Sequence, residues 1–561
     1  MSALSLRSGR TIFLALLLVI TLIGAAARLY RLEEKSLWSD EVATIATSLG
    51  NAIDPQAYRL RGAAFDTPEP VPAAIYAEKA TRSHGAGNFA RTAEVLRTNV
   101  HPPLFFWLMN LWIHAFGSDP GALRLPAAFF GILAIPLIGR VALKIFDLNG
   151  ETAETPRTQW RRYGFSLLSA AFMALSAYQV DHSQDARQYT FLVVLALLAV
   201  GLAARLVRDA GRSWLSWLGL ALVLAMGLYT QYFFMVFAGF VLLYLGWQGL
   251  RDQQFLLKLA LTASLVGLLV LPWLEIFQEQ MAFFKTVGHY TVGLWSPVRL
   301  PEKLWRIVCE FFLPKNGLGK LIPVLVLVAA LLIGWTRQKN PDSKSLPASR
   351  FMSPALTLIL LWLGLVIGGQ VVLDILKNTQ TATIRRYLLL ASPACYLLLA
   401  YCLVWMGAGI NGRRWQKMLT TGLTVLMLGL MAGDTGHILF RKHTGSDEFK
   451  QAAAWINQGY QPGDLVLVSK SGAMATGMAL YLKPETRMLG VDVQNFQELD
   501  DGSPLMRRLD RTVEGKQRVW LVFSHAARST RFQLDAWLAA KHFRPVEALK
   551  VPGVRVSLMR R

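Results

Sequence analysis

The sequence has little cysteine, and its cysteines form no metal-binding or redox motif. Three cysteines, Cys309, Cys395 and Cys402, occur among 561 residues, and all lie in or beside apolar stretches. There is no CxxC pair and no Cys/His cluster with the spacing of a zinc site. The sequence therefore encodes neither a disulfide framework nor a structural zinc site.

Charged residues are scarce as well, at 17% of the chain against 53% hydrophobic residues. This balance lies outside the range of soluble domains and is typical of polytopic membrane proteins. The formal net charge is nevertheless +22, which in a soluble protein would favour nucleic acid as a partner. Because the cytoplasmic loops of membrane proteins collect Lys and Arg, we expect a lipid bilayer as partner and no nucleic acid.

Motifs for nucleotide binding are absent from the polar C-terminal stretch, 445–561. It has no P-loop, and no GxGxxG follows its first predicted strand. Alternating helix and strand patterns predict a soluble α/β domain of ordinary size here. The predicted helices are a first one capped by Ser446, Asp447 and Glu448 that ends at Ile456, then Ala473–Leu482, Leu505–Val513 and Thr530–His542; the predicted strands are Asp464–Val468, Met488–Val491, Val519–Phe523 and Val554–Leu558.

Long apolar runs predict about 11 membrane-spanning helices. The first has a basic start like a signal peptide, but no cleavage site leads into a polar mature domain, so we interpret it as an uncleaved span. The loop from Arg140 to Arg162 is rich in Arg, so we expect it and the N-terminus in the cytoplasm. On that orientation 445–561 is external, and the aromatic helix that follows His101 and ends near Gly117 does not cross. The predicted spans are Thr11–Ala27, Leu125–Ile145, Phe165–Val180, Tyr189–Leu206, Trp214–Tyr229, Phe233–Leu250, Leu259–Trp273, Lys320–Trp335, Met352–Leu373, Tyr387–Met406 and Leu419–Met431.

The loop from Arg28 to Asn99, external on this orientation, carries the adjacent acids Asp40 and Glu41 shortly after the first span. Burying two adjacent acids in the membrane would cost free energy, so acids this close to a span are expected at the water interface and in a functional role. Apolar residues recur at helical spacing after them, so we expect a short helix on the membrane surface. From this stretch alone, a catalytic role is as well supported as a role of Ser39 or Asp40 as helix N-cap.

Two further polar segments fall between predicted spans on the same external face. Carboxylates suit the deprotonation of a sugar hydroxyl, and the planar fork of arginine binds phosphate oxygens bidentately. With His101, these two segments provide carboxylates and phosphate-binding arginines at the membrane interface. A sugar donor linked to a lipid phosphate needs both kinds of group. The first segment contains Asp181, His182, Asp185, Arg187 and Tyr189, and the second contains Arg385, Arg386 and Tyr387.

Each segment also has a purely structural interpretation. The stretch from Asp181 to Arg187, taken alone, is better explained as a solvated turn with local ion pairs. Arg385 and Arg386 alone serve equally well as anchors to lipid headgroups, and His101 before two prolines serves as a helix start. His182 and Asp185 supply only two ligands of a metal site, so no metal site is assigned and a divalent cation is left open.

These motifs together resemble those of the GT-C glycosyltransferases, specifically the bacterial relatives of protein O-mannosyltransferases and of the lipid A aminoarabinose transferase. The resemblance covers roughly residues 11–406, and its most specific part is the spacing of Asp-Glu and His-Pro-Pro. The Trp-Trp-Asp motif of oligosaccharyltransferases is absent. The residues that carry the resemblance are Leu37 to Glu41, His101 to Leu104, Gly117, Arg124 to Pro126, Asp185 to Tyr189 and Arg386 to Leu388.

The resemblance implies a fold, an activity and partners. The fold is a polytopic all-α membrane module of GT-C type over 1–440, with juxtamembrane helices in the first external loop, 28–117, and an external α/β domain over 445–561. Asp40 takes the position of the catalytic acid, with Glu41 beside it. The donor is a polyprenyl-phosphate sugar, the acceptor is a hydroxyl-bearing lipid, glycan or protein of the envelope, and the location is the bacterial inner membrane with a periplasmic active site.

Two other classes of protein remain as alternatives. A transporter or flippase of lipid-linked glycans is expected to carry ionisable groups and broken helices near mid-membrane. The charges here sit at span ends, apart from Asp374 near one end, which weighs against this class. A non-catalytic receptor uses its external domain to bind a partner. A cavity lined by both the external acids and the arginines would favour the enzyme over either alternative.

Overall fold

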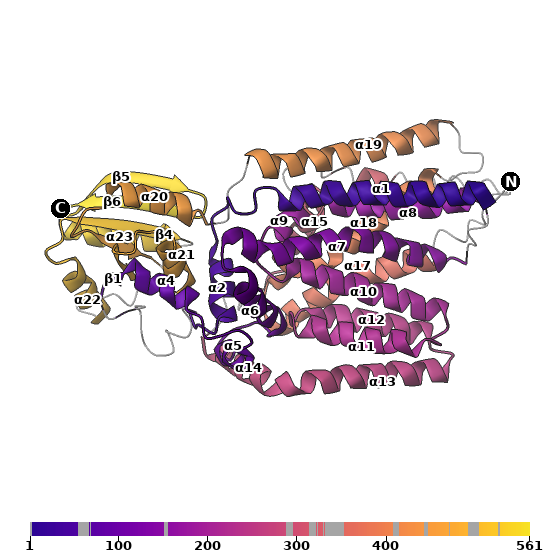
Figure 1. Cartoon of the computed structure of the whole chain (residues 1–561), viewed down its shortest axis with the longest axis horizontal. Coiled ribbons are helices and arrows are strands. Elements are labelled where there is room, and N and C mark those ends of the chain that lie inside the picture. Colours follow the sequence, from indigo (N-terminus) through magenta and orange to yellow (C-terminus); the bar gives the residue numbers. More distant parts are fainter. Residues whose placement is uncertain are drawn as a thin grey trace. The chain divides into compact units, whose positions relative to one another are not determined.

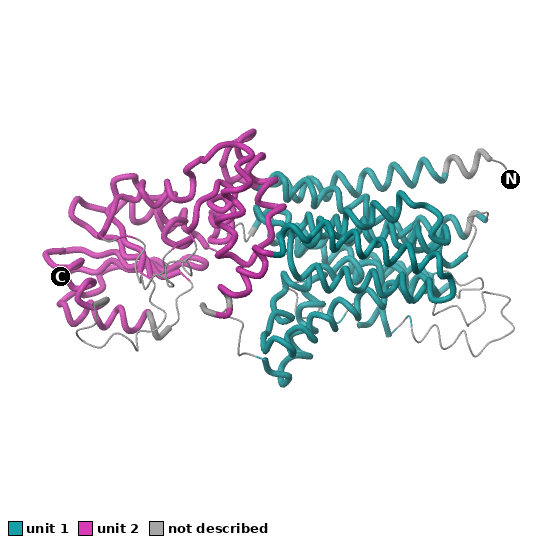
Figure 2. Tube along the Cα trace, turned by 90° about the horizontal axis from the view of Figure 1, so that it is seen from below, with its two compact units in different colours: residues 1–30, 124–274, 289–442 teal, residues 31–123, 275–288, 443–561 magenta. Residues whose placement is uncertain are grey.

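A computed structural model gives the arrangement of the helices and strands (Figure 1). The chain divides into two compact units (Figure 2): unit 1 comprises 1–30, 124–274 and 289–442, and unit 2 comprises 31–123, 275–288 and 443–561. The residues that the structure describes are 3–53, 67, 69–150, 155–287, 295–313, 321, 324–328, 330, 353–407, 414–441, 447–469, 472–491, 504–524 and 528–561.

Unit 1 is a bundle of apolar helices. Neighbours in it include α1 with α8, α10 with α11, and α12 with α17. Large apolar side chains of α1 and α13, such as Leu14, Leu22 and Leu268, point outward, as expected where a helix faces lipid. Its elements are α1 (Ala3–Leu29), α7 (Pro120–Asp147), α8 (Pro156–Leu175), α9 (Ala177–Ser183), α10 (Tyr189–Arg208), α11 (Trp214–Leu228), α12 (Phe234–Gln248), α13 (Gln253–Val270), η1 (Leu271–Trp273), α15 (Leu300–Glu310), α17 (Pro354–Lys377), η4 (Thr381–Thr383), η5 (Arg385–Ala391), α18 (Ser392–Gly407), α19 (Arg414–Gly436) and η6 (His437–Arg441).

Seven helices within the described residues are long and apolar enough to cross a membrane, which confirms a multi-pass membrane protein. Trp214–Leu228 and Phe234–Gln248 are apolar but shorter, at 15 residues each. The predicted span Lys320–Trp335 lies largely outside the described residues, so the count of about 11 stays a prediction. The seven are Gly9–Leu29, Pro120–Asp147, Tyr189–Arg208, Gln253–Phe283, Pro354–Lys377, Arg385–Gly407 and Arg414–Phe440.

Unit 2 contains a six-stranded mixed sheet in the order β1-β3-β2-β4-β6-β5. β2 is parallel to β3 and β4, and the other neighbouring pairs are antiparallel. Its elements are α2 (Ser39–Ser48), β1 (Val71–Pro72), α4 (Ala73–Thr81), α5 (Phe89–Leu96), α6 (Leu104–Phe116), α14 (Leu274–Val287), α20 (Phe449–Gly459), β2 (Leu465–Val468), α21 (Ala473–Ala479), β3 (Arg487–Gly490), α22 (Pro504–Val513), β4 (Arg518–Ser524), α23 (Arg528–Ala540), β5 (Arg544–Val551) and β6 (Val554–Arg560).

Both faces of the sheet are covered, which explains the uninterrupted apolar run of β2. Val466 and Val468 point into a core with α4, α20 and α21, whereas Leu465 and Leu467 point into a second core with α22 and α23. Successive side chains of a strand alternate between the faces of a sheet, so each of the two cores receives every second residue. The structure thereby confirms the predicted C-terminal α/β fold.

The long loop after α1 contributes to the sheet and to its core. β1 pairs with β3, aligning Val71 with Met488. Tyr76 of α4 is fully buried in the core that contains Phe449 and Trp520, and its hydroxyl accepts a hydrogen bond from the Gly490 N–H at 2.8 Å. Residues 31–123 therefore belong to the same compact unit as 443–561, which differs from the predicted grouping of 28–117 with the membrane module.

Three parts of the chain differ from the prediction. No helix was predicted between the spans Leu259–Trp273 and Lys320–Trp335, but α14 and α15 lie there. Both are amphipathic, with a single apolar face, so neither forms the long apolar run by which the spans were predicted. The edge strand β5 is missing from the prediction because it is largely exposed and shows no alternation of apolar and polar residues. The predicted span Phe165–Val180 is α8 from Pro156, followed by a break at Ser176 and the short α9.

Candidate functional site

Asp40 and Glu41 lie in the first turn of α2, and the structure gives them different environments. The Glu41 side chain is buried, and its carboxylate accepts a hydrogen bond from the Trp38 N–H at 3.2 Å. This bond satisfies an N–H group that the start of a helix leaves without an intrahelical partner, as one half of a capping box does. Asp40 is partly exposed. The N-cap position, considered above for Ser39 or Asp40, is occupied by Trp38, and Glu41 supplies the side-chain hydrogen bond at the start of α2.

The segment that leads into α2 is held by residues from the C-terminal part of unit 2. The Ser39 N–H donates to Asp447 Oδ2 at 3.1 Å, and the Leu37 N–H donates to the Tyr481 hydroxyl at 2.9 Å. Asp447 was expected to cap the helix that follows it, but α20 has no side-chain cap, and this fully buried carboxylate binds Ser39 instead. The start of the acidic helix is thus positioned by residues far away in the sequence.

His101 precedes α6, as predicted, and α6 packs against α2. The His101 ring lies 6.0 Å from the ring of Phe106, and its carbonyl accepts a hydrogen bond from the buried Gln280 side chain at 3.1 Å. α6 has 13 residues, about 20 Å at 1.5 Å per residue and shorter than the ~30 Å hydrocarbon core. It ends before Gly117, whose φ of 85° and ψ of −177° suit only glycine.

The other two polar segments meet in unit 1. The Arg385 guanidinium forms an ion pair with Asp181 at 3.1 Å, and the Tyr178 hydroxyl donates to the Arg385 carbonyl at 2.8 Å. Arg385 is exposed, and so exposed an ion pair contributes only ~0–1 kcal/mol. Arg385 can therefore exchange its contact with Asp181 for one with a phosphate oxygen at a small cost in free energy.

His182 lies buried between the aromatic rings of this cluster. Its ring centre is 4.6 Å from that of Tyr178 and 4.8 Å from that of Tyr189. Among the described residues neither ring nitrogen has a hydrogen-bond partner, and the nearest carboxylate oxygen, from Asp185, is 3.7 Å from Nδ1. Buried polar groups are nearly always satisfied, so these nitrogens are suited to binding water or a ligand.

The two Arg–Tyr pairs have the cation–π geometry that their sequence spacing indicates. The Arg187 guanidinium is 6.0 Å from the centre of the Tyr189 ring, and that of Arg386 is 5.5 Å from the Tyr387 ring. Arg187 is buried, whereas Arg386 is partly exposed. Stacking on an aromatic face limits the orientations of the planar guanidinium group, which helps it to present its fork to an anion.

Asp374 positions the arginine segment, a role that the sequence did not reveal. The carboxylate is fully buried at the end of α17 and accepts hydrogen bonds from the Thr381 N–H at 2.8 Å and the Ala382 N–H at 2.7 Å. The hydroxyl groups of Thr379 and Thr381 donate to it as well. The carboxylate thus fixes the loop and η4 directly before Arg385. A run of threonines after a helical Asp is the signal that could have indicated it.

Arg28 is a second residue whose role was missed. It is buried, and its guanidinium donates to the carbonyls of Met173 and Ala174 at 2.8 and 3.1 Å. These carbonyls belong to the last turn of α8, where a cation is favourable. Gln184 in turn donates to the carbonyls of Arg28 and Tyr30 at the end of α1. The segment with Asp181 and His182 is thereby tied to two helix ends.

The candidate residues fall into two groups. Asp40, Glu41 and His101 belong to unit 2, and the acids, arginines and tyrosines of the other two segments belong to unit 1. The convergence of both groups on one surface stays a prediction. No three His, Cys, Asp or Glu side chains come together as metal ligands within the part of the chain that the structure describes.

No family model and no curated protein matches the chain. Two solved structures are similar to it over nearly their whole length, at low identity. ArnT from Cupriavidus metallidurans in the apo state is 13% identical with a TM-score of 0.40, over 99% of this chain and 98% of that chain. ArnT from Cupriavidus metallidurans bound to undecaprenyl phosphate is 14% identical with a TM-score of 0.38, over 98% of this chain and 97% of that chain. ArnT is the lipid A aminoarabinose transferase, with the GT-C fold, and so belongs to the family whose motifs this sequence resembles.

Proposed function

We propose that this chain is a membrane glycosyltransferase that moves a sugar from a polyprenyl-phosphate donor to a hydroxyl-bearing acceptor of the cell envelope. The acceptor is a lipid, a glycan or a protein. The reaction takes place at the outer face of the bacterial inner membrane, with the N-terminus in the cytoplasm and 445–561 in the periplasm. The positive-inside distribution of Arg and Lys supports this orientation.

In the proposed reaction Asp40 removes the proton from the acceptor hydroxyl. The hydroxyl oxygen then forms a bond to the anomeric carbon while the bond between that carbon and the phosphate oxygen breaks. Polyprenyl phosphate leaves as an anion, and this single displacement inverts the anomeric centre. Glu41 supports Asp40 through its hydrogen bond to the Trp38 N–H at the start of α2.

The developing charge on the leaving phosphate is stabilised by Arg187, Arg385 and Arg386, with Tyr189 and Tyr387 stacking on two of them. Preorganised cations aimed at developing charge supply a large share of catalysis in many enzymes. The observation that carries the proposal is the contact between the two polar segments: Arg385 of one forms an ion pair with Asp181 of the other, at the ends of apolar spans. Nearby lies the buried His182 ring, whose nitrogens have no hydrogen-bond partner among the described residues. An anionic group of a membrane lipid suits this location.

The structure weakens one alternative in particular. A flippase is expected to carry unpaired ionisable groups along its spans. Asp374 is the acid that lies near the end of a span in α17, and its carboxylate is occupied by hydrogen bonds from its own loop. This occupancy supports a structural role for Asp374 and favours the enzyme.

The direct test uses the purified protein in lipid nanodiscs with a panel of polyprenyl-phosphate sugars and an extract of envelope acceptors. Mass spectrometry should show release of polyprenyl phosphate together with an acceptor that has gained the mass of the sugar. Empty nanodiscs serve as the control. Movement of intact donor across proteoliposomes without release would instead identify a flippase, and binding without either event would identify a receptor.

A further inference from the structure

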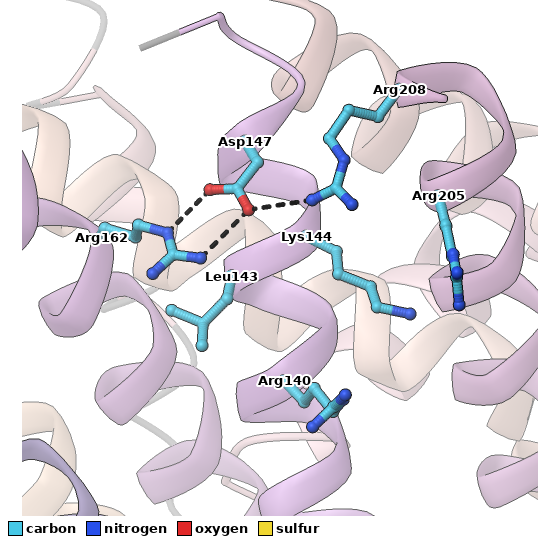
Figure 3. Close-up of a pocket in the computed structure, with 7 residues that line it drawn as sticks. All are labelled: Arg140, Leu143, Lys144, Asp147, Arg162, Arg205 and Arg208. Atoms are coloured by element: carbon cyan, nitrogen blue, oxygen red, sulfur yellow. Dashed lines mark hydrogen bonds and ion pairs between the residues drawn. The ribbon is translucent and has the colours of Figure 1, made fainter. Parts of the chain in front are cut away.

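A second cationic site lies in unit 1, at the opposite ends of the spans from the cluster with His182. It is a cavity of about 340 Å³ between α7, α8 and α10 (Figure 3). Its lining includes the cations Arg140, Lys144, Arg162, Arg205 and Arg208 and the single carboxylate Asp147. The volume is roughly ten times the ~30 Å³ that one water molecule occupies in the liquid, so the cavity has room for an anionic group.

The one carboxylate in the cavity is already engaged. Asp147 accepts two hydrogen bonds from Arg162, at 2.7 and 3.0 Å, and lies 3.6 Å from Arg208 (Figure 3). The same Arg208 and Arg205 are also paired with Asp209, at 3.2 and 3.3 Å. Asp147 and Asp209 are therefore paired with three arginines, and neither forms an ion pair with the two other cations of the cavity.

Arg140 and Lys144 provide the excess of positive charge. Lys144 is half-buried and donates to the Gly201 carbonyl at 3.0 Å, a neutral partner, and it forms no ion pair with a carboxylate of the described residues. Arg140 is one helical turn away on α7 and has no acidic partner among the described residues. Cations at i and i+4 on one helix repel each other, and a bound anion would remove that repulsion.

We propose that this cavity binds the phosphate group of an anionic phospholipid. Guanidinium and ammonium groups bind phosphate oxygens through charge-assisted hydrogen bonds. α7 and α10 are candidate membrane spans, and the cavity lies near the C-terminal end of each, where a helix that crosses the bilayer would approach the lipid headgroups. Basic pockets between spans at the cytoplasmic side recognise such headgroups, and this end is the one predicted to face the cytoplasm. The lipid is distinct from the proposed donor and does not take part in sugar transfer.

The test measures lipid retention by native mass spectrometry of the purified protein after exchange into detergent with phosphatidylglycerol or phosphatidylcholine. The wild type should retain phosphatidylglycerol preferentially. The double variant Arg140→Gln/Lys144→Gln should lose roughly thirtyfold in affinity, from about 1 kcal/mol for each cation at the membrane surface. The single variant Arg140→Gln changes only an exposed side chain, so it keeps the fold and should lose part of the affinity.

The matched control is Arg212→Gln/Arg251→Gln. It removes the same charge from exposed positions on the same predicted side, outside the cavity, and should bind like the wild type. Equal retention by the control and both cavity variants would overturn the proposal, because general attraction to a basic surface would then explain binding. Displacement of the lipid by millimolar inorganic phosphate would also overturn it, since the site would then take soluble phosphate.

Discussion

The Arg385 guanidinium is the group whose chemistry can be changed with least damage to the fold. It is exposed, it lies 6.0 Å from the centre of the Tyr178 ring, and it forms an ion pair with Asp181. A change here should therefore alter the binding of phosphate more than it alters stability.

We predict that Arg385→Lys lowers the rate of sugar transfer by about tenfold, or ~1.4 kcal/mol. The reason is that a point charge replaces a planar fork that binds two phosphate oxygens. Steady-state kinetics with a polyprenyl-phosphate sugar measure the effect. Arg299→Lys, at an exposed arginine before α15, is the control and should leave the rate unchanged. A wild-type rate in Arg385→Lys would assign Arg385 to headgroup anchoring.

At the scale of an element, α2 shows how unit 2 supports the proposed chemistry. Its first turn carries the acids, and the Ser39 N–H at its start donates to the buried Asp447 carboxylate. Removal of a buried acceptor leaves the donor unsatisfied, at a cost of ~1–3 kcal/mol. The same change would loosen the helix that positions Asp40.

We predict that Asp447→Ala lowers both the melting temperature and sugar transfer, whereas Asp447→Asn retains most of both. The amide oxygen of Asn still accepts the hydrogen bond from Ser39, so the conservative variant should rescue the positioning. Thermal unfolding in detergent and the transfer assay give the two readouts. Equal loss in the Ala and Asn variants would show that the negative charge of Asp447 matters, not its hydrogen bond.

The sequence predicted the elements that have a strong local pattern. Strands β2, β3, β4 and β6 and helices α21, α22 and α23 were placed within a few residues, because they are apolar runs or helices with a clear period. β1 could not be predicted, since two residues of the first loop form a strand only by pairing with β3. Pairing across such a distance leaves no local signal.

The site residues follow the same division. The sequence placed Arg385 and Asp181 on the same side of the membrane, but it could not predict their ion pair, because a sequence gives no distance between two loops. The role of Arg28 depends on backbone carbonyl groups, which no residue pattern encodes. The role of Asp374 is signalled only by the threonines that follow it, whose hydroxyl groups donate to its carboxylate. The assignment of the capping bond to Glu41 instead of Asp40 likewise needed coordinates.

On the scale of the whole molecule, each compact unit is assembled from segments that are distant in the sequence. The proposed orientation makes a prediction for single cysteines introduced into a variant without Cys309, Cys395 and Cys402. A membrane-impermeant thiol reagent applied to intact spheroplasts should label Gly85→Cys and spare Thr158→Cys. Both positions lie outside the seven candidate spans, and Thr158 lies within the basic stretch from Arg140 to Arg162 that is predicted to be cytoplasmic. The reverse labelling would overturn the orientation.

The central claim concerns the Asp40 carboxylate, and the most direct measurement compares transfer rates of Asp40→Asn and the wild type in nanodiscs. Asn keeps the size of the side chain, and the capping bond of α2 comes from Glu41, so the fold should survive. Loss of a general base should lower transfer by about two to four orders of magnitude. Glu41→Gln should cost less, because its amide oxygen still accepts from the Trp38 N–H. Transfer by Asp40→Asn at the wild-type rate, with the protein monodisperse, would contradict the proposed mechanism.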